Sequence, residues 1–263
     1  MHSSVKISEK KINELLGGRA SVRVFDQVGS TNTLLKTAAE AGAPHGAVIV
    51  AREQTAGRGR MGRSFHSPLG TGLYVSILVR PELAAENVLL ITPLSAVALC
   101  SALERHGCLG TQIKWVNDIY VDDKKAAGIL VEGAVTSDGR IDYAVVGIGV
   151  NLYSPDGGFP DEISATACGA FDGNDRAIDC DRLVSDIIDE FLSLFEKLPE
   201  REFMSEYRRR SYLLGKPVTV TRGDGIYFGV AAEVDDSARL VVDCDDGVRR
   251  VFDSGEARAR AKK

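Results

Sequence analysis

The sequence lacks an apolar run long enough to cross a membrane, since a helical span needs roughly 18 or more uninterrupted apolar residues. The best candidate, residues 88–103, is interrupted by Thr92, Pro93, Ser95 and Ser101, and its composition favours a buried helix. Residues 1–16 are polar and contain lysines, so they have no apolar core of the secretory-signal type. We therefore expect no membrane partner and a cytoplasmic location.

Paired cysteines are also lacking. The chain has 5 cysteines, and none of them forms a Cys-x-x-Cys pair. This spacing argues against a zinc knuckle and against a disulfide framework. We expect reduced cysteines that serve as small apolar side chains.

An excess of positive charge is the third absence. The formal net charge is −5, which argues against a general nucleic-acid binder. The positive charge is nevertheless uneven, because Arg52, Arg58, Arg60 and Arg63 crowd one short stretch. This local asymmetry is more informative than the total charge.

Hydrophobic patterning predicts a mixed α/β arrangement over most of the chain. Strands are expected over residues 22–25, 46–51, 72–79, 111–115, 126–135 and 143–150, with a hairpin turn at Asp138-Gly139. Helices are expected from Ser30 or Thr31 to about Gly42, over 87–106 and over 183–198.

The composition changes after about Leu214. Short β-rich runs follow at residues 217–221, 226–234, 239–242 and 248–252, separated by turn residues. This pattern predicts a small all-β barrel of roughly fifty residues, a size that is marginal in isolation. We expect two domains, at residues 1–212 and 213–263.

The stretch EQTAGRGRMGR at residues 53–63 combines glycines with arginines between two buried strands. Glycine lets the backbone approach a ligand closely, and arginine presents a planar fork to phosphate or carboxylate oxygens. We expect a loop that is mobile alone and ordered by an anion. A solvated basic loop and an RNA-contacting patch are the alternatives.

A second group consists of Lys114, expected on a strand, Asn117 and Asp118, expected in a turn, and Lys125, expected in the turn of the hairpin that follows. An ammonium group facing a cavity neutralises an α-phosphate and an attacking carboxylate, which otherwise repel each other. Gly128 within the following strand indicates close approach by a ligand or another backbone. A surface hairpin with a lysine-rich turn is the alternative.

Two further segments place polar groups at the ends of elements. Ser30, Thr31 and Asn32 begin the first expected helix, where they cap it or bind a polar ligand. Asn151 ends a buried strand, where it contacts a nucleotide or starts a turn.

Together and in order, these segments resemble the biotin–protein ligase family. The matching pieces are GSTN (29–32), EQTAGRGRMGR (53–63), SPLGTGLYVSI (67–77), KWVNDIYVDDKKAAGILVE (114–132) and VVGIGVNL (145–152). GKPVTV (215–220) and SGEARAR (254–260) fit the family's small C-terminal domain more loosely. The resemblance implies an α/β catalytic domain similar to class II aminoacyl-tRNA synthetases, followed by an SH3-like β-barrel.

The resemblance also implies roles for individual residues. The biotin-binding positions are Ser30, Thr31, Asn32, Gln54, Arg58, Gly59, Arg60 and Lys125. The ATP-binding positions are Arg58, Arg60, Arg63, Lys114, Asn117, Lys125 and Asn151. Lys125, Arg60 and Asp118 are the expected catalytic residues. Asp118 matches an acidic residue of the family that orients the incoming lysine or assists the metal.

The implied reaction joins biotin to ATP and transfers biotin from biotinyl-5'-AMP to a lysine of a biotin carboxyl carrier protein. Mg²⁺ is expected to accompany ATP. The sequence departs from the family pattern at Met61, Phe65 and Val116, where arginine, tryptophan and proline are usual.

Three alternatives remain at this point. A lipoate/octanoate–protein ligase would use the same adenylate chemistry, but its glycine–arginine motif differs. A biotin-responsive repressor would need a helix-turn-helix unit, and only about twenty residues precede the first expected strand. An inactive binding module would not need these lysines and arginines. We expect no specific DNA partner; the oligomeric state is left open, a homodimer included.

Overall fold

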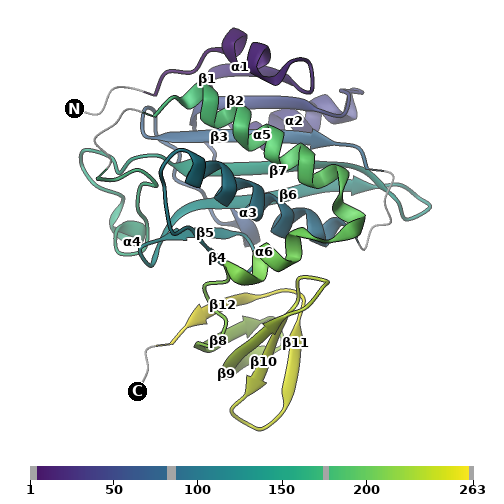
Figure 1. The fold of residues 1–263 in the computed structure, drawn as a ribbon, viewed down its shortest axis with the longest axis vertical. Helices are drawn as coiled ribbons and strands as arrows, with labels where there is room; N and C mark the ends of the chain where they lie inside the picture. Colours follow the sequence, from purple (N-terminus) through teal and green to yellow (C-terminus); the bar gives the residue numbers. More distant parts are fainter. Residues whose placement is uncertain (1–4, 82–86, 174–177, 261–263) are drawn as a thin grey trace.

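The computed structural model describes residues 5–81, 87–173 and 178–260 of the chain. Its larger part is a seven-stranded sheet in the order β1-β2-β3-β7-β6-β5-β4 (Figure 1). β1 and β2 are parallel, and all other neighbours are antiparallel. The strands are β1 Ser21–Val28, β2 Ala47–Gln54, β3 Gly72–Val79, β4 Gln112–Lys114, β5 Asp118–Val121, β6 Lys124–Val135 and β7 Ile141–Asn151.

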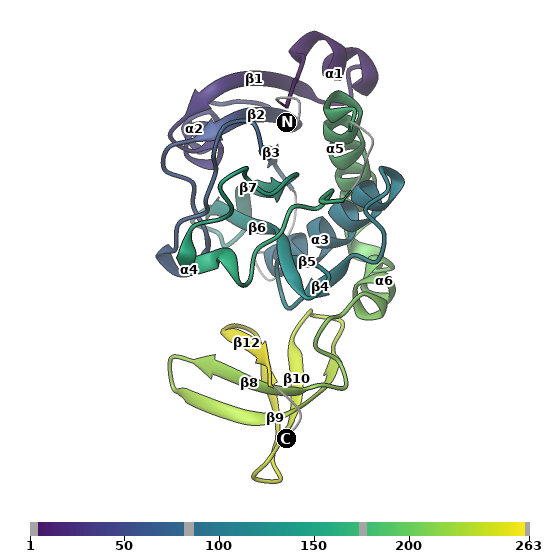
Figure 2. The same cartoon turned by 90° about the vertical axis from the view of Figure 1, so that its left-hand side faces the viewer.

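Helices cover both faces of this sheet (Figures 1 and 2). α3 (Val88–Arg105) and α5 (Cys180–Glu196) pack on one face over the larger hydrophobic core. α2 (Thr31–Glu40) packs on the other face, where Leu35 and Ala39 meet a smaller apolar cluster. β3 is buried along its whole length because both of its faces are covered.

α3 confirms the prediction of a buried helix at residues 88–103. Among the described residues, it is the one helix whose length and composition would suffice to cross a membrane, and 67% of that stretch is buried inside the protein. A helix that is apolar on all sides suits the interior of a large core. Its burial between the sheet, α5 and α6 (Phe203–Arg209) accounts for its composition.

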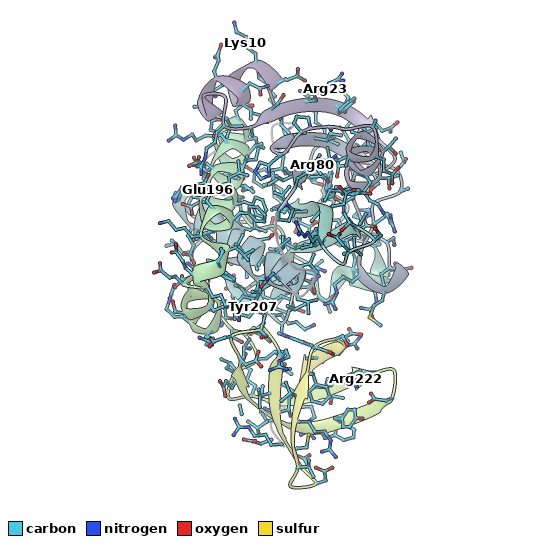
Figure 3. The ribbon with its side chains drawn as sticks, turned by 90° about the vertical axis from the view of Figure 1, so that its right-hand side faces the viewer. Lys10, Arg23, Arg80, Glu196, Tyr207 and Arg222 are labelled. Carbon is cyan, nitrogen blue, oxygen red and sulfur yellow. The ribbon has the colours of Figure 1, made fainter. Side chains whose placement is uncertain are left out.

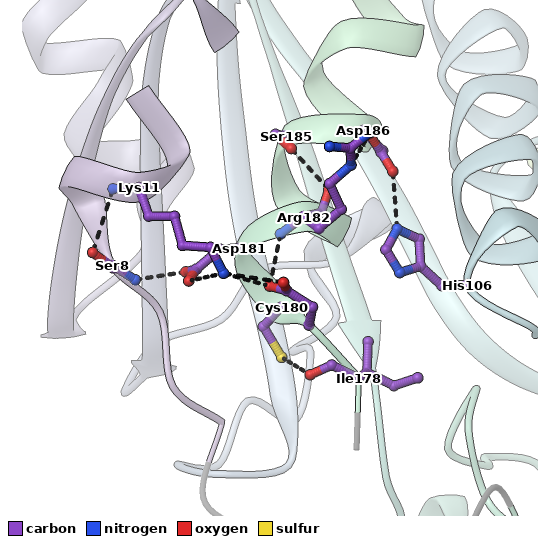
Figure 4. Close-up of polar contacts among 10 residues, drawn as sticks. Ser8, Lys11, His106, Ile178, Cys180, Asp181, Arg182, Ser185 and Asp186 are labelled. Carbon is purple, nitrogen blue, oxygen red and sulfur yellow. Dashed lines mark hydrogen bonds and ion pairs between the residues drawn. The ribbon is translucent and has the colours of Figure 1, made fainter. Parts of the chain in front are cut away.

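α1 (Glu9–Leu16) was not expected, because polar residues dominate this segment. Its Ile12 and Leu16 are buried, while Lys11 reaches two carboxylates at the start of α5 (Figure 4). Lys11 Nζ lies 3.0 Å from Asp179 and 3.3 Å from Asp181. α6 and the four-residue α4 (Asp161–Ser164) were also not expected, since segments this short carry little periodicity.

The second sheet has five strands in the order β11-β10-β9-β8-β12, all antiparallel. They are β8 Pro217–Arg222, β9 Gly225–Val234, β10 Leu240–Cys244, β11 Arg249–Phe252 and β12 Glu256–Ala259. The expected boundary between residues 212 and 213 falls in the connection from α6 to β8, near Tyr207 in Figure 3. A mixed α/β part followed by a small β part is therefore confirmed.

Polar contacts dock the small sheet on the larger part. Trp115 Nε1 donates to the carbonyl oxygen of Ala238 at 2.8 Å, across a buried contact. Arg208 Nε, on α6, donates to the carbonyl oxygen of Val234 at 2.6 Å. Because Trp115 directly follows β4, this docking brings the small sheet close to the predicted group of Lys114, Asn117, Asp118 and Lys125.

Candidate active site

A cavity of about 50 Å³ lies where the start of α2, the glycine–arginine loop and the strands β6 and β7 meet. All eight residues that the resemblance assigned to biotin line it: Ser30, Thr31, Asn32, Gln54, Arg58, Gly59, Arg60 and Lys125. The tertiary structure thus brings together side chains that are almost one hundred positions apart in the sequence.

The start of α2 is held by hydrogen bonds that fix its polar side chains. Ser30 caps the helix, since its Oγ accepts from the backbone N–H of Thr33 at 3.4 Å. The N–H and hydroxyl of Thr31 donate to Gln54 Oε1 at 2.8 and 3.0 Å. Ser76 Oγ lies 2.6 Å from Asn32 Oδ1. The residues at 30–32 therefore serve the helix and line the cavity at once.

Glycines on β7 let other groups approach the cavity floor. A Cβ at Gly147 would lie 2.2 Å from Asn32 Oδ1, and one at Gly149 would lie 2.7 Å from the Phe65 ring. Contacts this short do not occur between real side chains, so both positions require glycine. Phe65, where the family usually has tryptophan, packs over this floor.

Each of the loop's arginines has an acceptor from a different part of the molecule. Arg58 NH1 lies 3.1 Å from the Glu132 carboxylate on β6. Arg60 NH1 donates to Asn117 Oδ1 at 2.9 Å, in the turn before β5. Arg63 NH2 lies 2.6 Å from the carboxylate of Glu256 on β12. The positive charges of Arg58 and Arg63 are therefore offset by carboxylates, whereas Arg60 is held by a neutral amide.

A second cavity of about 110 Å³ adjoins the first. It is lined by Arg60, Arg63, Lys114, Asn117, Asp118 and Lys125, and by Gly255, Glu256 and Ala257 of the small sheet. Both cavities share Gly59, Arg60, Phe65, Asn117 and Lys125. The two cavities therefore adjoin each other along these shared residues, and the glycine–arginine loop borders both.

Lys125 lies at the junction of the two cavities. We expected it in a turn, which is wrong: it is the second residue of β6, and its backbone N–H donates to Thr166 at 2.7 Å. The turn between β5 and β6 consists of Asp122 and Asp123 alone. Their positive φ values of 48° and 62° reverse the chain, so that β6 begins at Lys124. Lys125 Nζ forms an ion pair with Asp118 at 2.7 Å.

Lys114 ends β4 and points into the second cavity. The backbone of its neighbour Ile113 is held by the Arg210 carbonyl oxygen at 2.8 Å. Burial lowers the pKa of the Lys114 ammonium below its usual value, and the nearby Asp118 partly opposes that shift. Lys114 Nζ lies 5.3 Å from the centre of the Tyr120 ring. Lys114 is half-buried and forms no ion pair within the described part of the chain, so its ammonium is suited to receive a phosphate.

Asn151 is the predicted site residue that the structure does not bring to either cavity. Its Nδ2 donates to the carbonyl oxygen of Cys168 at 3.3 Å, and its exposed fraction is 8%. The turn at Val116, where the family usually has proline, is held by two hydrogen bonds. Asn117 Nδ2 donates to the carbonyl oxygen of Ile129 at 2.9 Å, and the Tyr207 hydroxyl donates to that of Val116 at 3.3 Å. Met61 is exposed.

Two carboxylates at the site were not singled out from the sequence. Glu132 ends the KWVNDIYVDDKKAAGILVE segment, and Glu256 lies in SGEARAR. The alternation of residues 128, 130 and 132 along one strand could have placed Glu132 on the cavity side. Nothing in the sequence pairs Glu256 with Arg63. Their hydrogen bond lowers the pKa of Glu256 to about 2, with Arg258 contributing in the same direction.

Whether the site can hold a metal ion depends on the carboxylates that line it. Within residues 5–81, 87–173 and 178–260, no group of three His, Cys, Asp or Glu side chains could hold a metal ion. Asp118 and Glu256 line the second cavity. One or two carboxylates together with substrate phosphates are the usual setting of Mg²⁺, so the donors fit an ion that arrives with a nucleotide.

Family models match both parts of the chain. Residues 24–151 match the biotin/lipoate A/B protein ligase family, and residues 213–257 match the biotin protein ligase C-terminal domain. The first description covers ligases for either cofactor, whereas the second names biotin protein ligase alone.

Whole-chain relatives agree with these matches. The chain is 32% identical over 260 residues to the bifunctional ligase/repressor BirA of Bacillus subtilis, covering 94% of this chain and 78% of that protein. It is 30% identical to the biotin–[acetyl-CoA-carboxylase] ligase of Mycobacterium tuberculosis, covering 88% and 87%. A solved biotin protein ligase from Aquifex aeolicus, in complex with biotin and ATP, superposes with a TM-score of 0.78 at 26% identity, covering 91% of this chain and 99% of that one.

The two joined cavities, the small sheet beside them and these similarities lead to one assignment. The chain belongs to the biotin protein ligase family.

Proposed function

We propose that this biotin protein ligase binds biotin in the first cavity and ATP in the second, and joins them over Lys125. The observation that carries this proposal is that Lys125 and Arg60 line both cavities. A carboxylate in the first cavity and an α-phosphate in the second would both face the Lys125 ammonium. Two anions that must approach each other are thereby brought to one cation.

In the first step, a carboxylate oxygen of biotin attacks the α-phosphorus of ATP. A bond forms between that oxygen and phosphorus, pyrophosphate leaves with its electron pair, and biotinyl-5'-AMP remains. Lys125, Lys114 and Arg63 offset the charge on the phosphates. Mg²⁺, which we expect to enter with ATP, would be held by the phosphates and Asp118, and would neutralise the departing pyrophosphate.

In the second step, the neutral amine of an acceptor lysine attacks the biotinyl carbonyl carbon. A C–N bond forms, the bond from that carbon to the phosphate oxygen breaks, AMP leaves with the electron pair, and the proton lost by the amine passes to solvent. An ordinary lysine has a pKa of about 10.4, so it must lose a proton before it attacks. We assign to Asp118 the role of binding this incoming lysine. Lys125 and Asp118 now form an ion pair at 2.7 Å. When bound phosphates attract Lys125, this pair opens and the Asp118 carboxylate becomes free to accept a hydrogen bond from the amine.

The small sheet contributes one wall of the nucleotide cavity in this proposal. Glu256 lines the cavity and holds Arg63, so residues 213–263 act as part of the enzyme rather than as an independent module. We assign the biotin-binding surface to residues 1–212, although the parts of both ranges outside 5–81, 87–173 and 178–260 lie outside the described residues.

We propose a biotin carboxyl carrier protein as the acceptor, no sequence-specific DNA partner, and a cytoplasmic location. All five cysteines are free thiols, which suits a reducing compartment. A gel shift at physiological salt tests the DNA expectation, because weak electrostatic association disappears there whereas specific binding persists.

The deciding experiment is ATP–pyrophosphate exchange with biotin, lipoate or octanoate as the acid. We expect exchange with biotin and none above background with the other two. Exchange with lipoate at a rate equal to that with biotin would overturn the assignment of the first cavity to biotin.

A further inference from the structure

Glu132 is a carboxylate behind the first cavity that the proposed mechanism leaves without a role. Its strand, β6, lines the cavity with Gly128 and Leu130, and Glu132 continues the same face of the strand. Its side chain is 15% exposed and is not part of the lining. Glu132 can therefore act on the cavity only through its neighbours.

Three donors from two separate segments converge on this one carboxylate. Asn32 Nδ2 donates to Oε2 at 3.0 Å, and Lys36 Nζ donates to Oε1 at 3.3 Å. Asn32 and Lys36 are one helical turn apart on α2, so they share a face of that helix. Arg58 NH1, from the glycine–arginine loop, lies 3.1 Å from Oε1. The carboxylate thus connects the start of α2 with the loop.

The contacts also determine how Asn32 presents its amide. One N–H of Nδ2 donates to the carbonyl oxygen of Leu130 at 3.2 Å, and the other meets Glu132. Both donors are consumed behind the cavity, which leaves the Asn32 Oδ1 side toward Ser76 and the cavity. An amide at position 132 would offer its own N–H₂ to Asn32 in one of its two orientations and would no longer attract Arg58 as an anion.

We propose that Glu132 is a positioning residue for biotin: it fixes the Asn32 amide and anchors the Arg58 end of the loop over the first cavity. This inference rests on the proposed assignment of that cavity to biotin. Glu132 acts at the biotin end of the loop, whereas Glu256 holds Arg63 at the nucleotide end. The two carboxylates should therefore influence different substrates.

The test compares Glu132→Gln with the parent protein in biotin-dependent exchange. We expect the KM for biotin to rise roughly tenfold, in line with loss of the one charge-assisted contact between Glu132 and the half-exposed Arg58. The KM for ATP should change less than twofold, and biotinyl-5'-AMP should leave the enzyme several times faster. A purely structural residue would lower the melting temperature without this separation of the two KM values.

A double-mutant cycle identifies the path of the effect. If Glu132 acts on the loop through Arg58, the variant carrying both Arg58→Met and Glu132→Gln should lose biotin affinity less than the product of the two single losses. Effects that multiply fully, or a biotin KM within twofold of the parent in Glu132→Gln, would overturn the inference. Failure of the parent itself to use biotin would instead overturn the proposed function.

Two further variants keep the test decisive if Glu132→Gln folds poorly. Lys36→Met removes a cation that competes for the same carboxylate, so Arg58 should be held at least as well and the adenylate released no faster. Faster release in Lys36→Met would contradict the anchoring role. Glu233→Gln is the matched control, because Glu233 is an exposed carboxylate on β9 that lies 3.6 Å from Arg249. Its kinetic constants should equal those of the parent.

Discussion

The two cavities differ in how they are built, although they share a lysine and an arginine. The first is lined by buried neutral groups at 30–32, with exposed fractions of 4–7%, whose hydrogen-bond partners include Gln54, Ser76 and Glu132. The second is formed mainly by charged groups, and Glu256 reaches it from a separate sheet. The polar groups of the first cavity are fixed by hydrogen bonds within the protein, whereas the second cavity carries the cations Lys114, Lys125 and Arg63, which are suited to bind phosphate. Substitutions in them should accordingly affect different substrates.

Lys125→Ala should produce the largest effect, because this residue belongs to both cavities. We expect adenylate formation to fall by roughly 10²–10³-fold, as occurs when a preorganised donor to a developing charge is removed. Loss of Lys125 also leaves Asp118 as an unpaired anion facing the phosphates. Single-turnover adenylation measures the loss, and an unchanged circular dichroism spectrum controls for folding. Near-normal adenylation by the folded variant would remove Lys125 from the mechanism.

Arg60→Gly should separate synthesis of the adenylate from its retention. Arg60 touches Asn117 at 2.9 Å, and its replacement both removes a hydrogen bond and loosens the loop. The loss of about 1.5–3 kcal/mol corresponds to a roughly ten- to hundredfold increase in the population of the open loop relative to the closed one. Lys125 and Lys114 remain, so synthesis should continue and biotinyl-5'-AMP should escape.

Biotin labelling of serum albumin by the Arg60→Gly variant measures this escape, with the parent protein as the control. Strong labelling by the variant alone is expected. Labelling that stays confined to the carrier protein, while adenylate is still formed, would show that Arg60 does not retain the intermediate.

Lys114 should give the second cavity a pH dependence that the first lacks. Burial lowers the pKa of Lys114, so its positive charge is lost at a lower pH than that of a free lysine. Because the charged form binds phosphate, the KM for ATP should rise as pH increases through that pKa. The KM for biotin should stay constant over the same range.

Lys114→Arg provides the control for this pH effect, since arginine stays protonated throughout. Its KM for ATP should remain flat at alkaline pH, even if its value at neutral pH differs from that of the parent. A parallel alkaline rise in both proteins would assign the titration to another group.

Ser30 should give the smallest effect and tests whether the first cavity uses the capping hydroxyl. Ser30→Gly removes the hydroxyl but keeps most of the capping preference, whereas Ser30→Ala loses both, at about 1 kcal/mol of stability. If the hydroxyl binds biotin, both variants should raise the biotin KM a few-fold. If it only caps the helix, Ser30→Gly should retain the biotin KM of the parent, and thermal melting should distinguish the two.

Much of the site's chemistry could be predicted from local sequence, because it lies in short continuous segments. The loop at 53–63 and the segment from Lys114 to Lys125 each carry their charges at fixed spacing. All eight predicted biotin residues line the first cavity, while Asn151 lines neither cavity. The similarity of the catalytic domain to class II aminoacyl-tRNA synthetases and the roles of the individual residues stay predictions.

By itself, the sequence determined the alternation of strands and helices, the buried character of α3 and the small β part, since periodicity and turn residues are local properties. Only the tertiary structure decided which carboxylate meets which arginine. Arg58 and Glu132, or Arg63 and Glu256, are far apart in the chain, and only the register of β6 and the docking of Trp115 on Ala238 bring them together. Such pairings follow from the packing of whole sheets, so no single segment contains the information that specifies them.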